Sequence, residues 1–443
     1  MEEKKYYKKR LLAIAIPLML SNLVSQLQLM IDKIFLGRLD ISRMSAVGNA
    51  SAPLWTTISM MFSLSVGAAI IVSQAIGSED RERAKETISS LFKYNNIIAI
   101  LLFLFWFFCS KALFTLMGVS DEIMDMTVSY AKIYSPAFLI MGIGNGIITT
   151  LQVSEMTGIM VVYGLVRSGT NIVLDAILIF GKLGLPRMEV AGASLATLIA
   201  ELTGGIVLLI YVVCNKKIWL KPRLKDIIKA KPAPYISSVK MGLPSACEDV
   251  AWNGGNLFLI AMLNHVSMEA AGIYSIIFGV QCIPVAIIGA LSNATLTLAG
   301  QETGKGHAYE IMRIVRIALS WVFVMVFFVL IMFYLFPDTI IGWFTTDKAV
   351  ILASATYLMI VGVDLFPKSM NMIIGSGIKG YGATKWMLGT QIFGTCFIVI
   401  CSAVMVLVLH MGMTALFCLV VADETIRCTI NYIKLRHICN KTK

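Results

Sequence analysis

Long apolar runs separated by short polar segments are the dominant pattern along this chain. About twelve of the runs reach the roughly 20 residues that a helix needs to cross a bilayer, so we predict a membrane-spanning helix for each. The predicted spans are 11–37, 50–77, 89–117, 123–150, 158–181, 189–214, 237–264, 269–300, 309–336, 349–378, 385–409 and 411–433. The longest polar break divides the chain into an N-lobe (1–214), a basic linker (215–240) and a C-lobe (241–443), with six helices in each lobe.

The two lobes carry similar segments at corresponding places. Ser73–Gly77 lies at the end of the second predicted span, and Gly300–Gly304 begins at the end of the eighth. Two six-helix repeats of the same orientation imply a pseudo-twofold axis along the membrane normal and a central cleft between the lobes. We therefore expect an all-α membrane protein of twelve transmembrane helices that works by alternating access.

Composition supports a membrane protein and limits its partners. The chain has 443 residues, of which 58% are hydrophobic and 14% charged, and its mean hydropathy is +0.80. A soluble fold cannot hide so much apolar surface. The net charge of +11 comes from lysines and arginines between the spans, so we expect no nucleic acid partner.

The basic residues also predict the orientation. With the N-terminus inside, the interior holds the Lys-rich start, the loop at 78–86, the basic linker and the C-terminal tail. The exterior then holds little beyond Arg38, Arg43, Lys182, Arg187 and Lys348. Because cytoplasmic loops carry the excess of Lys and Arg, we expect both termini in the cytoplasm and the protein in the plasma membrane. The first helix lacks a cleavage site, so we expect it to be retained.

A polar stripe runs along the first predicted span. Ser21, Ser25, Gln28 and Asp32 are spaced so that they fall on one helical face. A carboxylate inside the membrane costs several kcal/mol unless it faces a partner, water or an ion, so Asp32 should point inward. Pro17 gives this helix a place to bend, and we expect it to act as a hinge that moves the stripe.

Further polar residues lie at the depth of Asp32. Asn171 and Asp175 are in the fifth span and Thr197 is in the sixth. Counted along their helices, Asp32, Asp175 and Thr197 lie roughly 8–12 Å below the outer surface. Such oxygens suit Na⁺, and two neighbouring carboxylates favour uptake of a proton. The alternative is that each polar group only bonds a neighbouring helix.

Two more polar residues complete the predicted substrate cleft of the N-lobe. Ser168 shares the polar face of the fifth span, and Glu201 lies one turn after Thr197 in the sixth. With Ser21, Ser25 and Gln28 of the first span, they would line the cleft.

The C-lobe carries a different set of charges. Glu248 and Asp249 lie within the seventh span, and Asp364 and Lys368 lie four residues apart in the tenth. That spacing favours an ion pair. The four residues could form a charge network with a role in transport, or they could only neutralise one another.

No pattern of catalytic chemistry is present. The nine cysteines are scattered without a Cys-x-x-Cys pair, and the four histidines lack metal-ligand spacing. The sequence carries neither a phosphate-binding loop nor a nucleophile motif. We therefore expect no enzyme activity, no cofactor and no metal other than a coupling Na⁺.

Several segments resemble the multidrug and toxic compound extrusion (MATE) family. The clearest are Met30–Leu39 (MIDKIFLGRL) and Asn171–Gly181 (NIVLDAILIFG). Shorter matches are Leu64–Ala68, Gln74 with Gly77, Val190–Thr197, Gly242–Ser245 and Gly377–Thr384. The matches keep the family's order over nearly the whole chain, so the resemblance is specific.

The resemblance implies an ion site and a hinge. In the DinF-like branch the site lies in the N-lobe, and it would fall here on Asp32, Asn171, Asp175, Thr197 and the backbone carbonyl of Ala193. Pro17 matches the proline at which the first helix bends in that branch.

The chain differs from the family's NorM-like branch at two positions. Two acidic residues of that branch would fall on Trp252 and Lys368. The chain is therefore more similar to the DinF-like branch.

The resemblance also implies the activity. Family members export amphipathic, often cationic, organic compounds in exchange for Na⁺ or H⁺. We expect such an antiporter here, acting as a monomer on a small molecule and surrounded by membrane lipid. A flippase for a lipid-linked precursor, from the same superfamily, is the alternative and would need a strongly cationic cavity. The choice between Na⁺ and H⁺ stays open.

Overall fold

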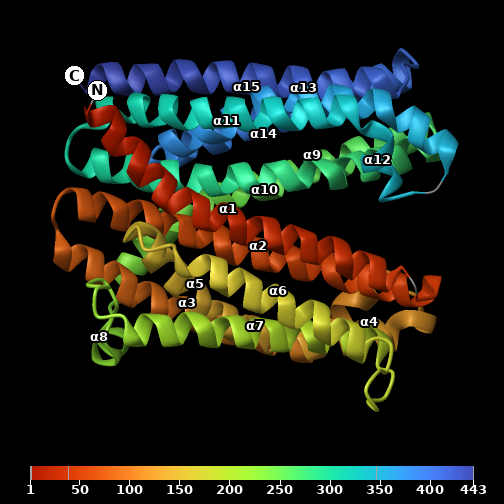
Figure 1. Cartoon of the computed structure of the whole chain (residues 1–443), viewed down its shortest axis with the longest axis horizontal. Helices are drawn as coiled ribbons and strands as arrows, with labels where there is room; N and C mark the ends of the chain where they lie inside the picture. Colours follow the sequence, from red (N-terminus) through yellow and green to blue (C-terminus); the bar gives the residue numbers. More distant parts are fainter. Residues whose placement is uncertain (1, 38, 346, 443) are drawn as a thin grey trace. The chain divides into compact units, whose positions relative to one another are not determined.

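The first half of the chain forms eight helices. The computed structural model describes residues 2–37, 39–345 and 347–442, so Arg38 lies outside the described residues. The helices are α1 (Glu2–Leu36), α2 (Ile41–Gly77), α3 (Arg81–Leu116), α4 (Asp121–Tyr134), α5 (Ala137–Val153), α6 (Ile159–Leu178), α7 (Glu189–Cys214) and α8 (Leu224–Lys229) (Figure 1). Of these, α8 lies within the predicted linker and is too short to cross a membrane.

The second half consists of helices joined by short turns and loops. Its elements are α9 (Pro232–Val266), α10 (Met268–Gly304), η1 (Ala308–Glu310), α11 (Ile311–Leu335), α12 (Pro337–Gly342), α13 (Lys348–Tyr381), α14 (Thr384–Ala403), η2 (Val404–Val408) and α15 (Met413–Lys441). The short π segment η2 continues α14 at its end.

Each of the twelve predicted spans corresponds to one long helix or to a pair of helices separated by a bend. Nine described helices are long and apolar enough to cross a membrane, and α4 with α5 forms a tenth span that bends by 40°. The bend lies at Pro136, whose ring nitrogen cannot donate to the preceding turn. The remaining two are α9 and α15, which carry charged residues within their length. The prediction of an all-α membrane protein with twelve spans is confirmed.

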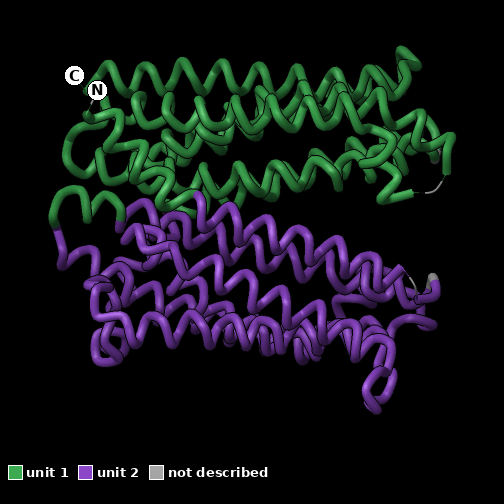
Figure 2. The backbone as a smooth tube through the Cα atoms, viewed as in Figure 1, with its two compact units in different colours: residues 1–15, 73–79, 241–443 green, residues 16–72, 80–240 purple. Residues whose placement is uncertain are grey.

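The described residues form two compact units (Figure 2). Unit 1 comprises Met1–Ala15, Ser73–Glu79 and Met241–Lys443, and unit 2 comprises Ile16–Val72 and Asp80–Lys240. Helix α1 therefore passes from one unit to the other directly before Pro17. Because a proline removes one backbone hydrogen bond from a helix, α1 is weakest at this passage.

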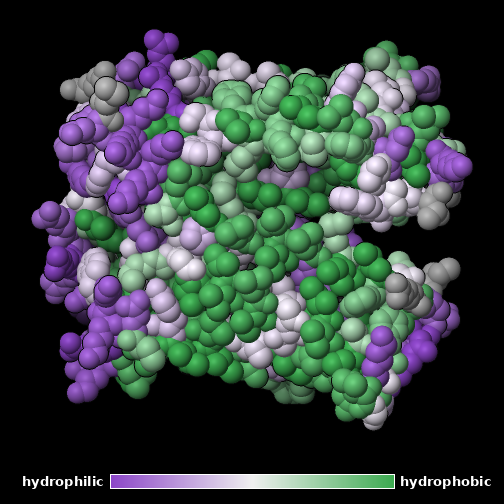
Figure 3. Space-filling model, viewed as in Figure 1, coloured by the Kyte–Doolittle hydropathy of each residue, from purple (hydrophilic) through white to green (hydrophobic). Residues whose placement is uncertain are grey.

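Apolar side chains cover the long sides of each unit on the face seen in Figure 3, and hydrophilic residues gather at the helix ends. Large side chains such as Phe108, Val324 and Ile400 are more than 60% exposed in mid-helix. A soluble protein would not expose so many apolar side chains, so this surface is suited to lipid.

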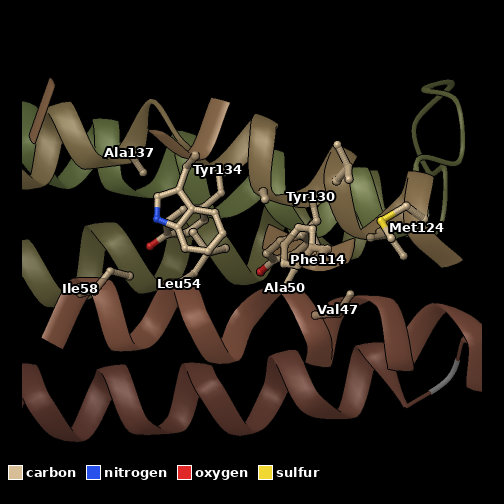
Figure 4. Close-up of a cluster of buried hydrophobic side chains, with 14 of the residues drawn as sticks. Val47, Ala50, Leu54, Ile58, Phe114, Met124, Tyr130, Tyr134 and Ala137 are labelled. Atoms are coloured by element: carbon tan, nitrogen blue, oxygen red, sulfur yellow. The ribbon is translucent and has the colours of Figure 1, made fainter. Parts of the chain in front are cut away.

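Unit 2 has a core of helices α2 to α5. Val47, Ala50, Leu54 and Ile58 recur every three or four residues and form one face of α2. Figure 4 shows this face packed against side chains of α3, α4 and α5, namely Phe114, Met124, Tyr130, Tyr134 and Ala137. Phe35 and Leu36 at the end of α1, the helix of the polar stripe, pack against this core.

Two glycines bring the polar helices together. A methyl group on Gly164 of α6 would lie 2.7 Å from the hydroxyl oxygen of Ser21 in α1. One on Gly192 of α7 would lie 2.8 Å from the carbonyl oxygen of Leu178 at the end of α6. Small residues permit close approach of membrane helices, so α1, α6 and α7 can share one polar interior.

A reciprocal glycine contact joins α2 and α10 within unit 1. The Cβ position of Gly77 falls on the carbonyl group of Gln301, and that of Gly304 falls on the carbonyl group of Gln74. Each residue pair has the spacing Gln-x-x-Gly, and the two pairs come from the similar segments of the two sequence halves. Side chains add to the contact, because Gln74 Nε2 donates to the Gly380 carbonyl at 3.0 Å.

We predict that Gly77→Ala and Gly304→Ala each destabilise the protein by about 1–3 kcal/mol or prevent assembly, because the added methyl group has no room. Gly48→Ala in α2 and Gly272→Ala in α10 are matched controls, since nothing lies within 4 Å of their Cβ positions. Thermal unfolding in detergent checks the prediction. Equal stability of all four variants would contradict it.

Candidate ion and substrate site

The side chain of Gln28 is the centre of a buried hydrogen-bond network in unit 2. Its Nε2 donates to Asp32 Oδ2 at 3.2 Å and to Asn171 Oδ1 at 2.6 Å. Its Oε1 accepts from Ser168 Oγ at 2.9 Å and from Arg167 Nη1 at 3.3 Å. Gln28 is 4% exposed. One amide thus joins the polar faces of α1 and α6.

Two carboxyl groups lie side by side next to this amide. Those of Asp32 and Asp175 are close enough to interact directly. Asp175 is 2% exposed, and its Oδ1 has no hydrogen-bond partner among the described residues. Two neighbouring carboxylates in such a place are costly, and a proton or a cation between them would lower the cost.

The remaining oxygens of the predicted ion site are contiguous with this pair. Asn171 Nδ2 donates to Thr197 Oγ1 at 3.3 Å, and Thr197 Oγ1 donates to the Ala193 carbonyl at 3.0 Å. With the Asn171 amide turned over, its nitrogen would lie 3.0 and 3.3 Å from the two Asp32 oxygens. All five residues of the predicted ion site therefore lie together. They offer carboxylate, amide, hydroxyl and carbonyl oxygens, which are the ligands of hard cations.

A buried ion pair that the sequence analysis missed lies beside this group. Arg167 Nε donates to Glu201 Oε1 at 2.8 Å, and the two side chains are 20% and 7% exposed. Arg167 lies inside the predicted span 158–181, and an arginine within a span is itself a signal of function. Its contact with Gln28 connects the ion pair to Asp32.

A cavity of 660 Å³ opens onto these residues within unit 2. Ser21, Ser25, Gln28 and Glu201 line it, as predicted for the substrate cleft, whereas Ser168 is 1% exposed and is not among the lining residues. Asp32, Thr197 and Arg167 also reach the cavity wall. The aromatic part of the wall consists of Trp55, Phe62, Tyr130, Tyr134 and Tyr163.

The charges predicted in the C-lobe fall into two groups in unit 1. Lys368 Nζ lies 3.9 Å from Asp364 Oδ2, and Gln281 bonds both residues at 2.9 and 3.2 Å. Glu248 does not join them but pairs with Lys379 at 2.8 Å. Asp249 is partly exposed on the same helix as Glu248.

A second buried charge cluster in unit 1 was also missed. Arg427 of α15 bonds Asp423 at 2.9 Å, Glu424 at 2.7 Å and the Gln391 amide oxygen at 2.7 Å. A methyl group on Gly394 would lie 2.5 Å from Asp423 Oδ1, so α14 needs a glycine there. The signal in the sequence is an arginine, with acids three and four residues earlier, inside the predicted span 411–433.

The family model MatE matches residues 17–177 and 244–405. The chain belongs to the MatE family. It is thus a member of a family of multidrug efflux transporters, and the predicted resemblance is confirmed at the level of the family.

Similar named proteins and similar solved structures support the same family. The chain is 26% identical to a probable multidrug resistance protein NorM of Thermotoga maritima, over 86% of this chain and 82% of that protein. It is 25% identical to the multidrug export protein MepA of Staphylococcus aureus strain MRSA252, over 94% and 89% of the two chains. A multidrug resistance MATE family transporter, solved in an outward-facing conformation, shares the fold with a TM-score of 0.91 at 20% identity, and 99% of this chain and 97% of that chain are covered. The two-lobe, twelve-helix architecture is that of this MATE fold.

We predict that Glu201→Gln destabilises this MATE protein by about 3–5 kcal/mol, because it leaves the buried Arg167 charge without its partner. Replacing both residues by Met removes both charges and should restore most of the lost stability. Thermal unfolding in detergent measures both effects. A double variant no more stable than Glu201→Gln would contradict this account of the pair.

Proposed function

We propose that this MATE protein is a secondary antiporter that exports amphipathic or cationic organic compounds in exchange for Na⁺ or H⁺. The observation that carries the proposal is the group formed by Asp32, Asn171, Asp175, Ala193 and Thr197, which gathers two acids and three neutral oxygen ligands and reaches the cavity at Asp32 and Thr197. Exchange of one positive charge at this group would drive transport. Such a group is what the resemblance to the DinF-like branch implies, and we propose that the chain belongs to that branch.

The cavity of unit 2 has the chemistry of a site for such substrates. Its aromatic side chains present π faces, which attract organic cations. Its charged lining residues are two acids, Asp32 and Glu201, and two bases, Lys33 and Arg167. The lining is therefore balanced in charge and not strongly cationic, which disfavours the alternative of a flippase for an anionic lipid-linked precursor.

Competition for one carboxylate would couple substrate and ion. Asp32 belongs to the proposed ion site and also lines the cavity. A Na⁺ or proton bound at Asp32 removes the negative charge that holds a cationic substrate, and a bound substrate excludes the ion. Such negative coupling is reciprocal, as antiport requires.

The rest of the transport cycle follows from the same proposal. We place both termini in the cytoplasm and the protein in the plasma membrane, because the basic residues gather on that side. Pro17 lies where α1 passes between the two units and would act as the hinge that moves the Asp32 stripe. The pair of Asp364 and Lys368 is internally neutralised, so we assign the C-lobe charges a structural role.

We predict that Asp32→Asn and Asp175→Asn each reduce gradient-driven efflux of a cationic dye from proteoliposomes by about tenfold or more, because an amide cannot neutralise a bound cation. Imposing a Na⁺ gradient and a pH gradient separately identifies the coupling ion. Asp125→Asn is the matched control, since it makes the same change at an exposed position and should transport normally.

Two outcomes would contradict the proposed site. In the first, both Asn variants are well folded and respond to the gradients as the unmodified protein does. In the second, Asp125→Asn loses coupling to the same extent, which would mean that overall charge, and not the buried pair, is responsible.

A further inference from the structure

The segment between α7 and α9 is folded against α3. Ile218 and Leu220 are 1% and 0% exposed. Lys93 of α3 donates to the carbonyl oxygens of Ile228 and Ala230 at 2.8 and 3.0 Å, which fixes the end of α8. Tyr94 of α3 also stacks on Tyr235 at 5.5 Å between ring centroids. The basic linker is therefore a folded part of unit 2, packed against α3.

This fold forms an open cavity of 580 Å³ beside the first turns of α3. Five basic side chains line it against the three acids Glu82, Glu86 and Asp226. The basic residues are Lys85, Lys221, Arg223, Lys229 and Lys231. Lys221 donates to backbone carbonyls at the end of α7. For the other four, no ion pair within 4.0 Å is found in the described chain, so they are available to an anion.

Two apolar residues of α8 are next in sequence to residues that line this cavity, because Leu224 follows Arg223 and Ile228 precedes Lys229. Leu224 and Ile228 lie on one face of α8 and are 72% and 63% exposed. Lys225 and Lys229 lie on the other face. Trp219, over which the Arg81 guanidinium stacks at 5.6 Å, is a further partly exposed aromatic side chain of this region. A helix with such faces lies at the boundary between head groups and acyl chains.

We propose that this cavity binds the phosphate of an anionic phospholipid head group. Arg223, Lys229 and Lys231 would contact the phosphate oxygens, and Leu224 and Ile228 would enter the acyl region beside it. A free phosphate ion would satisfy the basic side chains equally well but would leave the apolar face of α8 in water. The adjoining apolar face therefore favours a lipid. Basic clusters next to membrane helices attract anionic lipids on the cytoplasmic side, which is the side proposed for this segment.

The experiment uses the full chain in vesicles of phosphatidylcholine, with and without phosphatidylglycerol. We expect phosphatidylglycerol to raise the unfolding temperature, and native mass spectrometry to detect bound phosphatidylglycerol. Lys229→Gln with Lys231→Gln should weaken that binding about tenfold or more and remove the stabilisation. Leu224→Ser with Ile228→Ser should also weaken it, because the acyl contact is lost.

Lys216→Gln with Lys217→Gln is the matched control, since it removes the same charge from the linker outside the cavity. The control should bind the lipid as the unmodified protein does. If the control lost lipid binding to the same extent, the general surface charge of the linker, and not this cavity, would be responsible for binding. Inorganic phosphate that stabilises the protein in pure phosphatidylcholine as well as phosphatidylglycerol does would overturn the assignment to a lipid. None of these measurements depends on transport activity.

Discussion

A charge within a membrane-spanning helix must find a partner inside the protein, and in unit 2 the side chain of Gln28 arranges those partners. Its amide donates to Asp32 and accepts from Arg167, whose guanidinium holds Glu201. Both parts of the amide are used, so no polar atom of the side chain is left over. The positions of α1, α6 and α7 relative to one another follow from this chain of contacts and from the small residues that permit it.

The same chain of contacts connects the proposed ion site to the cavity. Asp32 belongs to both places, and Gln28 lies between Asp32 and the Arg167–Glu201 pair. A change in the charge at Asp32 alters the field at Gln28, its hydrogen-bond partner, and at Arg167, which is connected to Asp32 by two hydrogen bonds through Gln28. In a medium of low dielectric constant such interactions are strong. The proposed coupling between ion and substrate would therefore need no long pathway.

Much of the fold could be predicted from the sequence, because length and hydropathy determine where a membrane helix begins and ends. The predicted span 189–214 coincides with α7. The predicted span 123–150 is instead two helices, since Pro136 breaks it. The structure places Asp32, Asp175 and Thr197 in one group, as the comparison of helical depths predicted, whereas ion binding by this group stays a prediction. The Arg167–Glu201 pair could not be found in this way, because depth says nothing of how neighbouring helices are rotated about their axes.

The two halves stabilise buried charge in the same way but with different consequences. In unit 1, Gln281 donates to Asp364 and accepts from Lys368, as Gln28 donates to Asp32 and accepts from Arg167 in unit 2. The two units differ in which acid pairs with the basic side chain. Lys368 is 3.9 Å from Asp364 and faces that acid itself, whereas Arg167 is held by Glu201. Among the described residues, neither Asp32 nor Asp175 forms an ion pair, and this is why the proposed exchangeable positive charge is assigned to unit 2 rather than to Asp364.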